Sequence, residues 1–202
     1  MNLAVRIGKM EMKNPVMTAS GCFGYGEEAS EYFDIARLGA VVVKGTTLEE
    51  RQGNAVPRIA ETAAGMLNSI GLQNVGISRF TGEKMPFLRT FDVPVVVNIS
   101  GKSADEYGEL ASILESVDGV HAVEINVSCP NVKYPGCGRT FAQDAAAVSE
   151  ITGAVRRRTE KTVICKLSPE VTDITDMARA AEAAGADAVS LINTFPGLSI
   201  DA

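Results

Sequence analysis

The stretch Ala122-Val123-Glu124-Ile125-Asn126-Val127 decides the fold class of this 202-residue chain. It is a nearly continuous apolar run, which is typical of a strand buried on both faces of a sheet. Similar runs lie at residues 15–19, 40–43, 93–97, 162–167 and 188–192. Helical periodicity separates several of them, at residues 104–117, 144–158 and 173–184. This alternation predicts an α/β fold with a parallel sheet and helical crossovers.

Two segments depart from the alternation. The first dozen residues alternate between apolar and polar side chains around Gly8-Lys9, which predicts a short hairpin. Residues 46–85 are rich in Gly, Asn, Arg and Pro. We expect a long functional loop there, because long irregular loops usually carry function. No shift in composition marks a domain boundary, so residues 1–202 are expected to form a single domain.

Polar residues stand at the carboxyl ends of the expected strands. They are Ser20, Lys44, Asn98, Asn126, Lys166 and the pair Asn193-Thr194. Any one of them could simply satisfy a loop carbonyl, since most buried polar groups are hydrogen-bonded structure. Two lysines and several amides together favour a site for an anionic ligand, because buried lysine needs a partner. In a (β/α)8 barrel these strand ends converge on one face, where active sites lie.

An open, doubly wound sheet is the alternative to a barrel. A dinucleotide-binding sheet carries G-x-G-x-x-G after an early strand, whereas Gly21, Gly24 and Gly26 have a different spacing. A complete eight-stranded barrel takes about 250 residues. The sequence is therefore expected to cover an N-terminal hairpin and about six of the eight βα units of a barrel.

Composition excludes several function classes. The chain has 25 acidic against 19 basic residues, a formal net charge of −6, so no nucleic-acid partner is expected. No apolar run approaches the length of a membrane span and no secretory signal is present, so we expect a cytoplasmic protein without a membrane segment. Four cysteines without a C-x-x-C pair, and His121 as the single histidine, do not predict a metal site.

The loop after residues 122–127 contains Ser128-Cys129-Pro130-Asn131. A thiol just past a strand end, among polar residues, can act as a nucleophile or a base. A buried inert cysteine is the alternative interpretation. His121 precedes the strand and is expected at the opposite end of the barrel, which disfavours a cysteine hydrolase. Proton transfer by Cys129, with a cofactor performing the electronic step, is the expectation.

Taken together, these motifs resemble the catalytic subunits of the dihydroorotate dehydrogenase family. The matching stretches are residues 14–21, 43–47, 68–74, 126–131 and 192–194. The resemblance is to the soluble class 1 enzymes, since Cys129 stands where the membrane-associated class has serine. Asn131-Val132-Lys133 resembles the NAD-linked class 1B. Gly138-Arg139-Thr140-Phe141-Ala142 departs from the glycine-phenylalanine-glycine pattern of that class, and Cys137 is an additional cysteine.

The resemblance implies a flavin-dependent (β/α)8 barrel that oxidises dihydroorotate to orotate in pyrimidine biosynthesis. Cys129 would take the C5 proton while a hydride passes from C6 to flavin mononucleotide (FMN). The implied substrate residues are Lys44, Asn68, Ile70, Gly71, Leu72, Asn126, Asn131, Asn193 and Thr194. The implied FMN residues are Ser20, Lys44, Gly45, Asn98, Asn126, Lys166 and Ile192. A homodimeric core and a partner subunit that carries FAD and an iron–sulfur cluster, and links the enzyme to NAD, are also implied.

Two alternatives stay open. Dihydropyrimidine dehydrogenase-like flavoenzymes have a similar Asn-x-Ser-Cys-Pro loop, but generally carry histidine where this chain has Asn131. The other alternative is a non-catalytic truncated barrel, because the family has two further βα units whose loops hold the flavin phosphate. For that reason residues 1–202 expressed alone are expected to bind FMN poorly.

Overall fold

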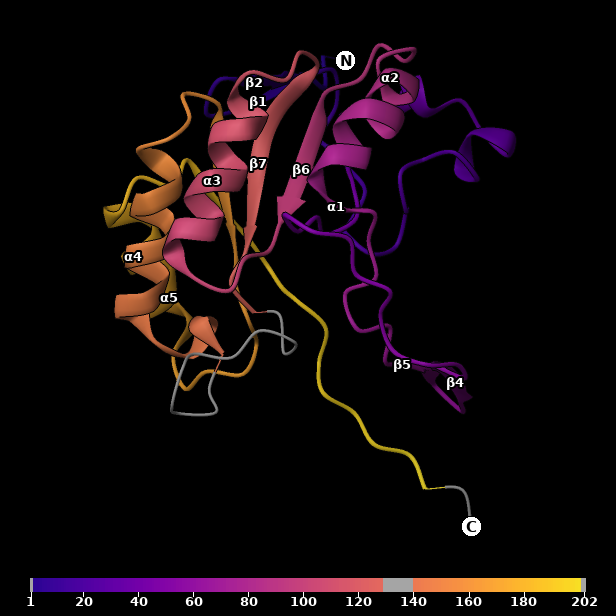
Figure 1. Cartoon of the computed structure of the whole chain (residues 1–202), viewed down its shortest axis with the longest axis vertical. Coiled ribbons are helices and arrows are strands. Elements are labelled where there is room, and N and C mark those ends of the chain that lie inside the picture. Colours follow the sequence, from indigo (N-terminus) through magenta and orange to yellow (C-terminus); the bar gives the residue numbers. More distant parts are fainter. Residues whose placement is uncertain (1, 129–139, 201–202) are drawn as a thin grey trace.

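The computed structural model of the chain describes residues 2–128 and 140–200. Its centre is a parallel five-stranded sheet in the order β3-β6-β7-β8-β9. The strands are β3 (Val41–Val42), β6 (Val95–Ile99), β7 (Val120–Asn126), β8 (Thr162–Lys166) and β9 (Ala188–Ser190). Because the strands are neighbours in chain order, every connection runs the same way and the sheet curls (Figure 1).

Three helices cover one face of this sheet (Figure 1). They are α3 (Ala104–Glu115), α4 (Ala145–Arg156) and α5 (Ile174–Ala183), and each packs against the next. Each helix is preceded by a capping residue whose side chain accepts a hydrogen bond from a backbone N–H of the first turn. The capping residues are Ser103 for α3, Asp144 for α4 and Asp173 for α5. The helices lie where the periodicity predicts them. This arrangement of curled parallel sheet and outer helices confirms the expected fold class, part of a (β/α)8 barrel.

The N-terminal hairpin closes the amino end of the inner face. It consists of β1 (Val5–Ile7) and β2 (Met10–Met12), as expected. Met10 and Met12 are buried in one apolar cluster with residues of the sheet strands, namely Ala40, Val42, Val96, Ala122 and Ile164. The Thr162 hydroxyl donates to the carbonyl of Ile7 and accepts from the Met10 amide. Only the carboxyl end of the inner face is therefore left for a ligand.

The first expected strand, residues 15–19, is wrong as a full strand. Only a single bridge joins Met17 to Ala40. Thr18 takes the place of ladder bonds, because its hydroxyl donates to the Val42 carbonyl and accepts from the Val42 amide. Pro15 has no N–H to donate to a ladder.

The expectation of one long loop at residues 46–85 is also wrong in part. It holds an antiparallel hairpin, β4 (Ile59–Thr62) and β5 (Gly65–Asn68). A helical stretch follows, made of α1 (Gly76–Arg79), a π-helical segment (Phe80–Lys84) and α2 (Met85–Leu88). Its apolar residues, among them Phe80, Met85 and Leu88, are fully buried in the core. Burial therefore stabilises a helix that the Gly and Pro residues of this segment make difficult to predict from the sequence.

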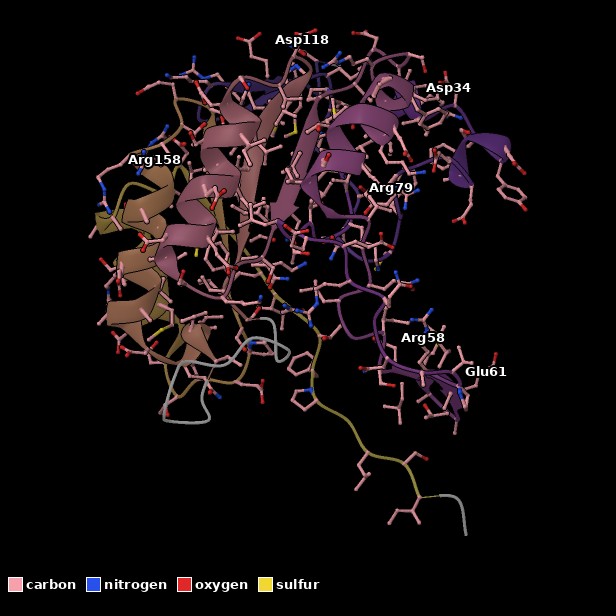
Figure 2. The ribbon with its side chains drawn as sticks, in the orientation of Figure 1. Asp34, Arg58, Glu61, Arg79, Asp118 and Arg158 are labelled. Carbon is pink, nitrogen blue, oxygen red and sulfur yellow. The ribbon has the colours of Figure 1, made fainter. Side chains whose placement is uncertain are left out.

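Short 3-10 helices complete the described structure, at Ala29–Glu31, Ile35–Arg37 and Phe141–Gln143. Within residues 2–128 and 140–200, no helix has the length and apolar character needed to cross a membrane. The β4–β5 hairpin projects beyond the carboxyl end of the sheet. Figure 2 shows Arg58 and Glu61 at this projection and Asp118 at the opposite end of the sheet.

Candidate active site at the carboxyl end of the sheet

Alternate residues of each strand face the inside of the curl. The odd-numbered residues of β6, such as Val97 and Ile99, pack into the main core with the helices. The even-numbered residues begin in the apolar cluster on the N-terminal hairpin and become polar towards the strand ends. The pairs are Val96 then Asn98 on β6, Ala122 then Glu124 on β7, and Ile164 then Lys166 on β8. The inner face therefore has an apolar floor and a polar rim.

Asn98 and Glu124 form the centre of this rim. They are register partners on adjacent strands, and both are buried. The Asn98 amide Nδ2 donates to Glu124 Oε1 over 2.6 Å. The other end of the amide, Oδ1, is buried without a hydrogen-bond partner among the described residues. A buried unpaired carbonyl is costly, so this atom is prepared for a donor from a ligand.

Gly45 and Leu72 lie against that unpaired atom. A Cβ added to Gly45 would lie 2.9 Å from Asn98 Oδ1 and 3.0 Å from Leu72 Cδ1. Glycine is thus required at position 45 for a ligand to approach Asn98. Leu72 has φ of 57°, a left-handed conformation that is strained for a branched side chain and is often found at binding sites. Gly71 beside it also has a positive φ.

Two lysines give the rim positive charge. Lys166 is buried and is the register partner of Asn126 and of Ser190. Lys44 is half-buried, and desolvation lowers its pKa, with a smaller contribution from Arg58 in the same direction. No ion pair within the described ranges involves either lysine. With Glu124 as the buried carboxylate on this face, the excess positive charge suits an anionic ligand.

A cluster of amides lies beside Lys166. Asn193 Nδ2 donates to Asn126 Oδ1 over 3.1 Å and to Ser128 Oγ over 2.6 Å. The Asn193 backbone N–H donates to the Leu167 carbonyl over 3.0 Å, which ties the chain after β9 to β8. The Tyr107 hydroxyl, from α3, donates to the Asn126 carbonyl over 2.7 Å. The cluster presents donors and acceptors at fixed positions, as recognition of a planar polar ring requires.

The structure therefore brings seven sequence-predicted residues to this end of the sheet. They are Lys44, Gly45, Leu72, Asn98, Asn126, Lys166 and Asn193. Ser20 and Ile192 are half-buried and flank the strand ends. Asn68 and Thr194 are exposed. Ile70 and Gly71 lie in the loop that follows the β4–β5 hairpin, where the backbone N–H of Asn54 donates to the Ile70 carbonyl. Cys129, the predicted base, and Asn131 lie outside the described residues.

Some polar residues of the rim escape the reasoning from strand ends. Glu124 stands in mid-strand, and Thr46 and Ser100 are fully buried just past β3 and β6. The Ser100 hydroxyl has no hydrogen-bond partner among the described residues. Thr46, Ser100 and Glu124 each stand two positions from Lys44, Asn98 and Asn126 respectively. Because alternate residues of a strand share a face, this spacing is the sequence signal that would have identified them. His121 lies at the amino end as expected, where Nδ1 accepts from the Val95 amide.

Comparison with known proteins decides which ligands to consider. The family model described as Dihydroorotate dehydrogenase matches residues 2–202. The chain belongs to this family. It is 54% identical over 200 residues to "Dihydroorotate dehydrogenase B (NAD(+)), catalytic subunit" of Geotalea daltonii, covering 99% of this chain and 65% of that one. Relatives of the same name in Bacteroides thetaiotaomicron and Desulforamulus reducens are 53% and 54% identical, with 100% of this chain and 66% of theirs covered.

The family resemblance expected from the sequence is confirmed by the family model and by these relatives, whose own names include NAD(+). The chain spans about 65% of the length of the Geotalea relative.

The rim residues fit the flavin that the family implies. A flavin ring needs a partner for its imide N–H, cations near the edge that becomes negative on reduction, and room for close approach. Asn98 Oδ1 is an unpaired buried acceptor, and Ser100 Oγ is a second unpaired group. Lys44 and Lys166 supply the cations, and Gly45 leaves open the approach to Asn98.

Proposed function

We propose that the protein oxidises dihydroorotate to orotate, as the catalytic subunit of an NAD-linked dihydroorotate dehydrogenase in pyrimidine biosynthesis. The observation that carries the proposal is the buried polar rim at the carboxyl end of the sheet, in a chain of this family. Residues 1–202 would form one domain within a (β/α)8 barrel. FMN, when bound, supplies the hydride acceptor.

The residues of the rim divide into two groups in this proposal. Ser20, Gly45, Asn98 and Ile192 hold FMN with Lys166, which stabilises negative charge near the ring. Lys44 and Asn126 stand between the two ligands and contact both. The support is that Asn126 and Lys166 are register partners, and that Lys44 is partly desolvated. Substrate is held by Asn68, Ile70, Gly71, Leu72, Asn131, Asn193 and Thr194.

Cys129 acts as the base in this proposal and takes the proton from C5 of dihydroorotate. It directly follows Ser128, whose hydroxyl accepts from Asn193 and donates to Asn126. The chain therefore reaches position 129 from the amide cluster that is proposed to hold the substrate. A thiolate is a far stronger base than a hydroxyl group, and its formation needs only a modest change from the ordinary thiol pKa.

The amides suit the substrate for a chemical reason. The pyrimidine ring of dihydroorotate offers two carbonyls and two N–H groups, and a side-chain amide can pair with either kind. Its carboxylate is drawn to Lys44. This favours dihydroorotate over an uncharged dihydropyrimidine, the substrate class of the alternative family, because a neutral substrate would leave the excess positive charge of the rim unpaired.

The relatives are named as catalytic subunits with NAD(+), which supports a partner subunit that passes electrons from FMN to NAD through FAD and an iron–sulfur cluster. A homodimeric core, a cytoplasmic location and the absence of nucleic-acid or membrane partners belong to the same proposal.

The test is to purify the protein from its complete reading frame, measure bound flavin by visible absorbance, and follow orotate formation from dihydroorotate with an artificial electron acceptor. Dihydrouracil, which lacks the carboxylate, serves as the competing substrate. Bound FMN with at least about a hundredfold preference for dihydroorotate is expected. Preference for dihydrouracil would favour the dihydropyrimidine alternative, and protein without flavin or turnover would favour a non-catalytic role.

A further inference from the structure

We propose that Glu124 is a positioning residue that fixes the side-chain amide of Asn98, so that the site presents a hydrogen-bond acceptor to the imide N–H of the flavin ring. This inference rests on the proposed function, because it needs a flavin at the rim. It assigns a role to a buried carboxylate in the middle of β7 that the reasoning from strand ends leaves without one.

The contact between the two side chains sets the orientation of the amide. An ionised carboxylate only accepts hydrogen bonds. The 2.6 Å contact between Asn98 Nδ2 and Glu124 Oε1 therefore requires the NH2 end of Asn98 to face Glu124. Oδ1 must then face the other way, towards Gly45. A neutral partner able to donate as well as accept would leave both orientations of the amide open.

Burial makes this orientation firm. Asn98 is fully buried and Glu124 nearly so. The two residues are register partners on β6 and β7, which are both interior strands of the sheet. Neighbouring side chains therefore leave little room for a different arrangement, and water competes poorly for either group. A charge-assisted hydrogen bond in such surroundings is stronger than a neutral one.

The unpaired end of Asn98 determines what the ligand must offer. Oδ1 has no partner among the described residues, so a ligand group that faces it must be a donor. The oxidised flavin ring has one N–H, at N3 of its pyrimidine part. A ligand that places an acceptor or a methyl group there would leave Oδ1 buried and unpaired.

The experiment compares FMN with its N3-methyl analogue, by titration of the apoprotein obtained from the complete protein and loss of flavin fluorescence. The wild-type protein is expected to bind the analogue about tenfold or more weakly, since a buried acceptor loses its donor. In Glu124→Gln the amide of Asn98 is free to turn, so the ratio of the two dissociation constants falls about fivefold or more. The bulk of the methyl group is the same in both proteins, so this change reports the amide.

Glu115→Gln is the matched control. Glu115 is also a hydrogen-bonded carboxylate, accepting from the Thr159 hydroxyl and the Glu160 amide, but it ends α3 at the amino side of the sheet. It should leave the ratio unchanged. Thermal unfolding of the apoproteins is measured in parallel, because a purely structural role of Glu124 would lower the melting temperature and weaken both flavins equally.

A second variant keeps the test independent of how well Glu124→Gln folds. Gly45→Ala places a methyl group 2.9 Å from Asn98 Oδ1, so it should also lower the ratio while leaving Glu124 in place. A wild-type ratio near one, or a ratio that folded Glu124→Gln leaves unchanged, would overturn the role of Glu124 and leave the proposed function intact; a ratio that Gly45→Ala leaves unchanged would show that Asn98 Oδ1 does not face the flavin N–H, which overturns the role as well. Failure of the wild-type protein to bind FMN at all would overturn both.

Discussion

Asn193 donates a hydrogen bond to the side-chain oxygen of Asn126 over 3.1 Å and thereby joins the ends of two strands that are not neighbours. Asn126 ends β7, Asn193 follows β9, and β8 lies between them in the sheet. The contact therefore passes over the end of β8, next to Lys166. Because Ser128 accepts from the same Asn193 nitrogen, one amide holds two residues of the strand end that leads to Cys129.

Asn193→Ala is expected to impair substrate use more than flavin binding. The substitution removes both hydrogen bonds and frees the Asn126 side chain to turn. At about 0.5–1.5 kcal/mol for each bond, kcat/KM for dihydroorotate should fall roughly fivefold to 150-fold. Steady-state kinetics on flavin-loaded protein measures this effect. Asn14→Ala is the control, because the Asn14 side chain bonds to the backbone of Arg37 and Val16, away from the carboxyl end of the sheet. An equal loss in both variants would contradict a role in substrate binding.

Cys129→Ser should retain flavin and lose most turnover near neutral pH. A serine hydroxyl is a much weaker base than a thiol, so turnover should recover in part as the pH is raised. The measurement is a pH–rate profile of kcat beside the flavin content. Ser116→Ala, at the exposed carboxyl end of α3, is the control and should turn over like the parent. If the serine variant at position 129 also kept its activity at pH 7, Cys129 would not be the base.

Cys165 should make the protein less stable at high pH. Burial raises the pKa of this thiol to about 12, while the hydrogen bond from Thr152 opposes the shift. The unfolded thiol loses its proton near pH 8.5, before the folded one, so this contribution is complete below that pH and is lost as the pH rises towards 12. Between pH 8 and 10.5 the loss should be about 2.5 kcal/mol.

The free energy of unfolding in urea, measured at pH 8 and pH 10.5, tests this effect. Cys165→Val is the comparison, because the other groups that titrate in this interval are the same in both proteins. The variant should lose less stability over this interval than the parent does. Equal losses would show that Cys165 does not titrate as its burial requires.

Periodicity was sufficient to predict most of the sheet and its outer helices. The runs that became β6 to β9 are mainly apolar and become polar towards their carboxyl ends, and Asp144 and Asp173 cap the helices that precede β8 and β9. The apolar pattern of residues 15–19 predicts a strand that does not form in full. The Thr18 side chain bonds to the Val42 backbone where a strand would form backbone hydrogen bonds, and the sequence pattern does not reveal such a long-range contact. The helical stretch at residues 76–88 has weak intrinsic propensity and depends on tertiary burial.

The site was predictable as far as strand ends allow. Lys44, Asn98 and Lys166 could be named because they interrupt apolar runs. Glu124 was missed since it stands in mid-strand, although its spacing of two from Asn126 places it on the same face. The bond between Asn193 and Asn126 could not be predicted, because it depends on how far the sheet curls around β8.

Lys44→Ala is expected to weaken binding of both FMN and orotate, whereas Lys102→Ala should change neither. Lys44 is half-buried at the end of β3 without an ion pair among the described residues, and Lys102 is exposed just before α3. Loss of one charge-assisted contact, about 1.5–3 kcal/mol, corresponds to roughly tenfold to a hundredfold in affinity. Titration of the flavin spectrum with orotate gives one affinity, and fluorescence of released flavin gives the other.

The pH dependence of orotate binding provides a second test of Lys44. Desolvation lowers its pKa, and the Arg58 charge lowers it further. The cation is therefore lost at a lower pH than an ordinary lysine would lose it, and orotate affinity should begin to fall there. Arg58→Ala, which removes the repulsion, should move this fall to higher pH, whereas Arg158→Ala, just past the end of α4 and far from Arg58 in Figure 2, should not. Equal effects of the lysine variants at positions 44 and 102, or a fall that Arg58→Ala leaves in place, would remove Lys44 from the anion site.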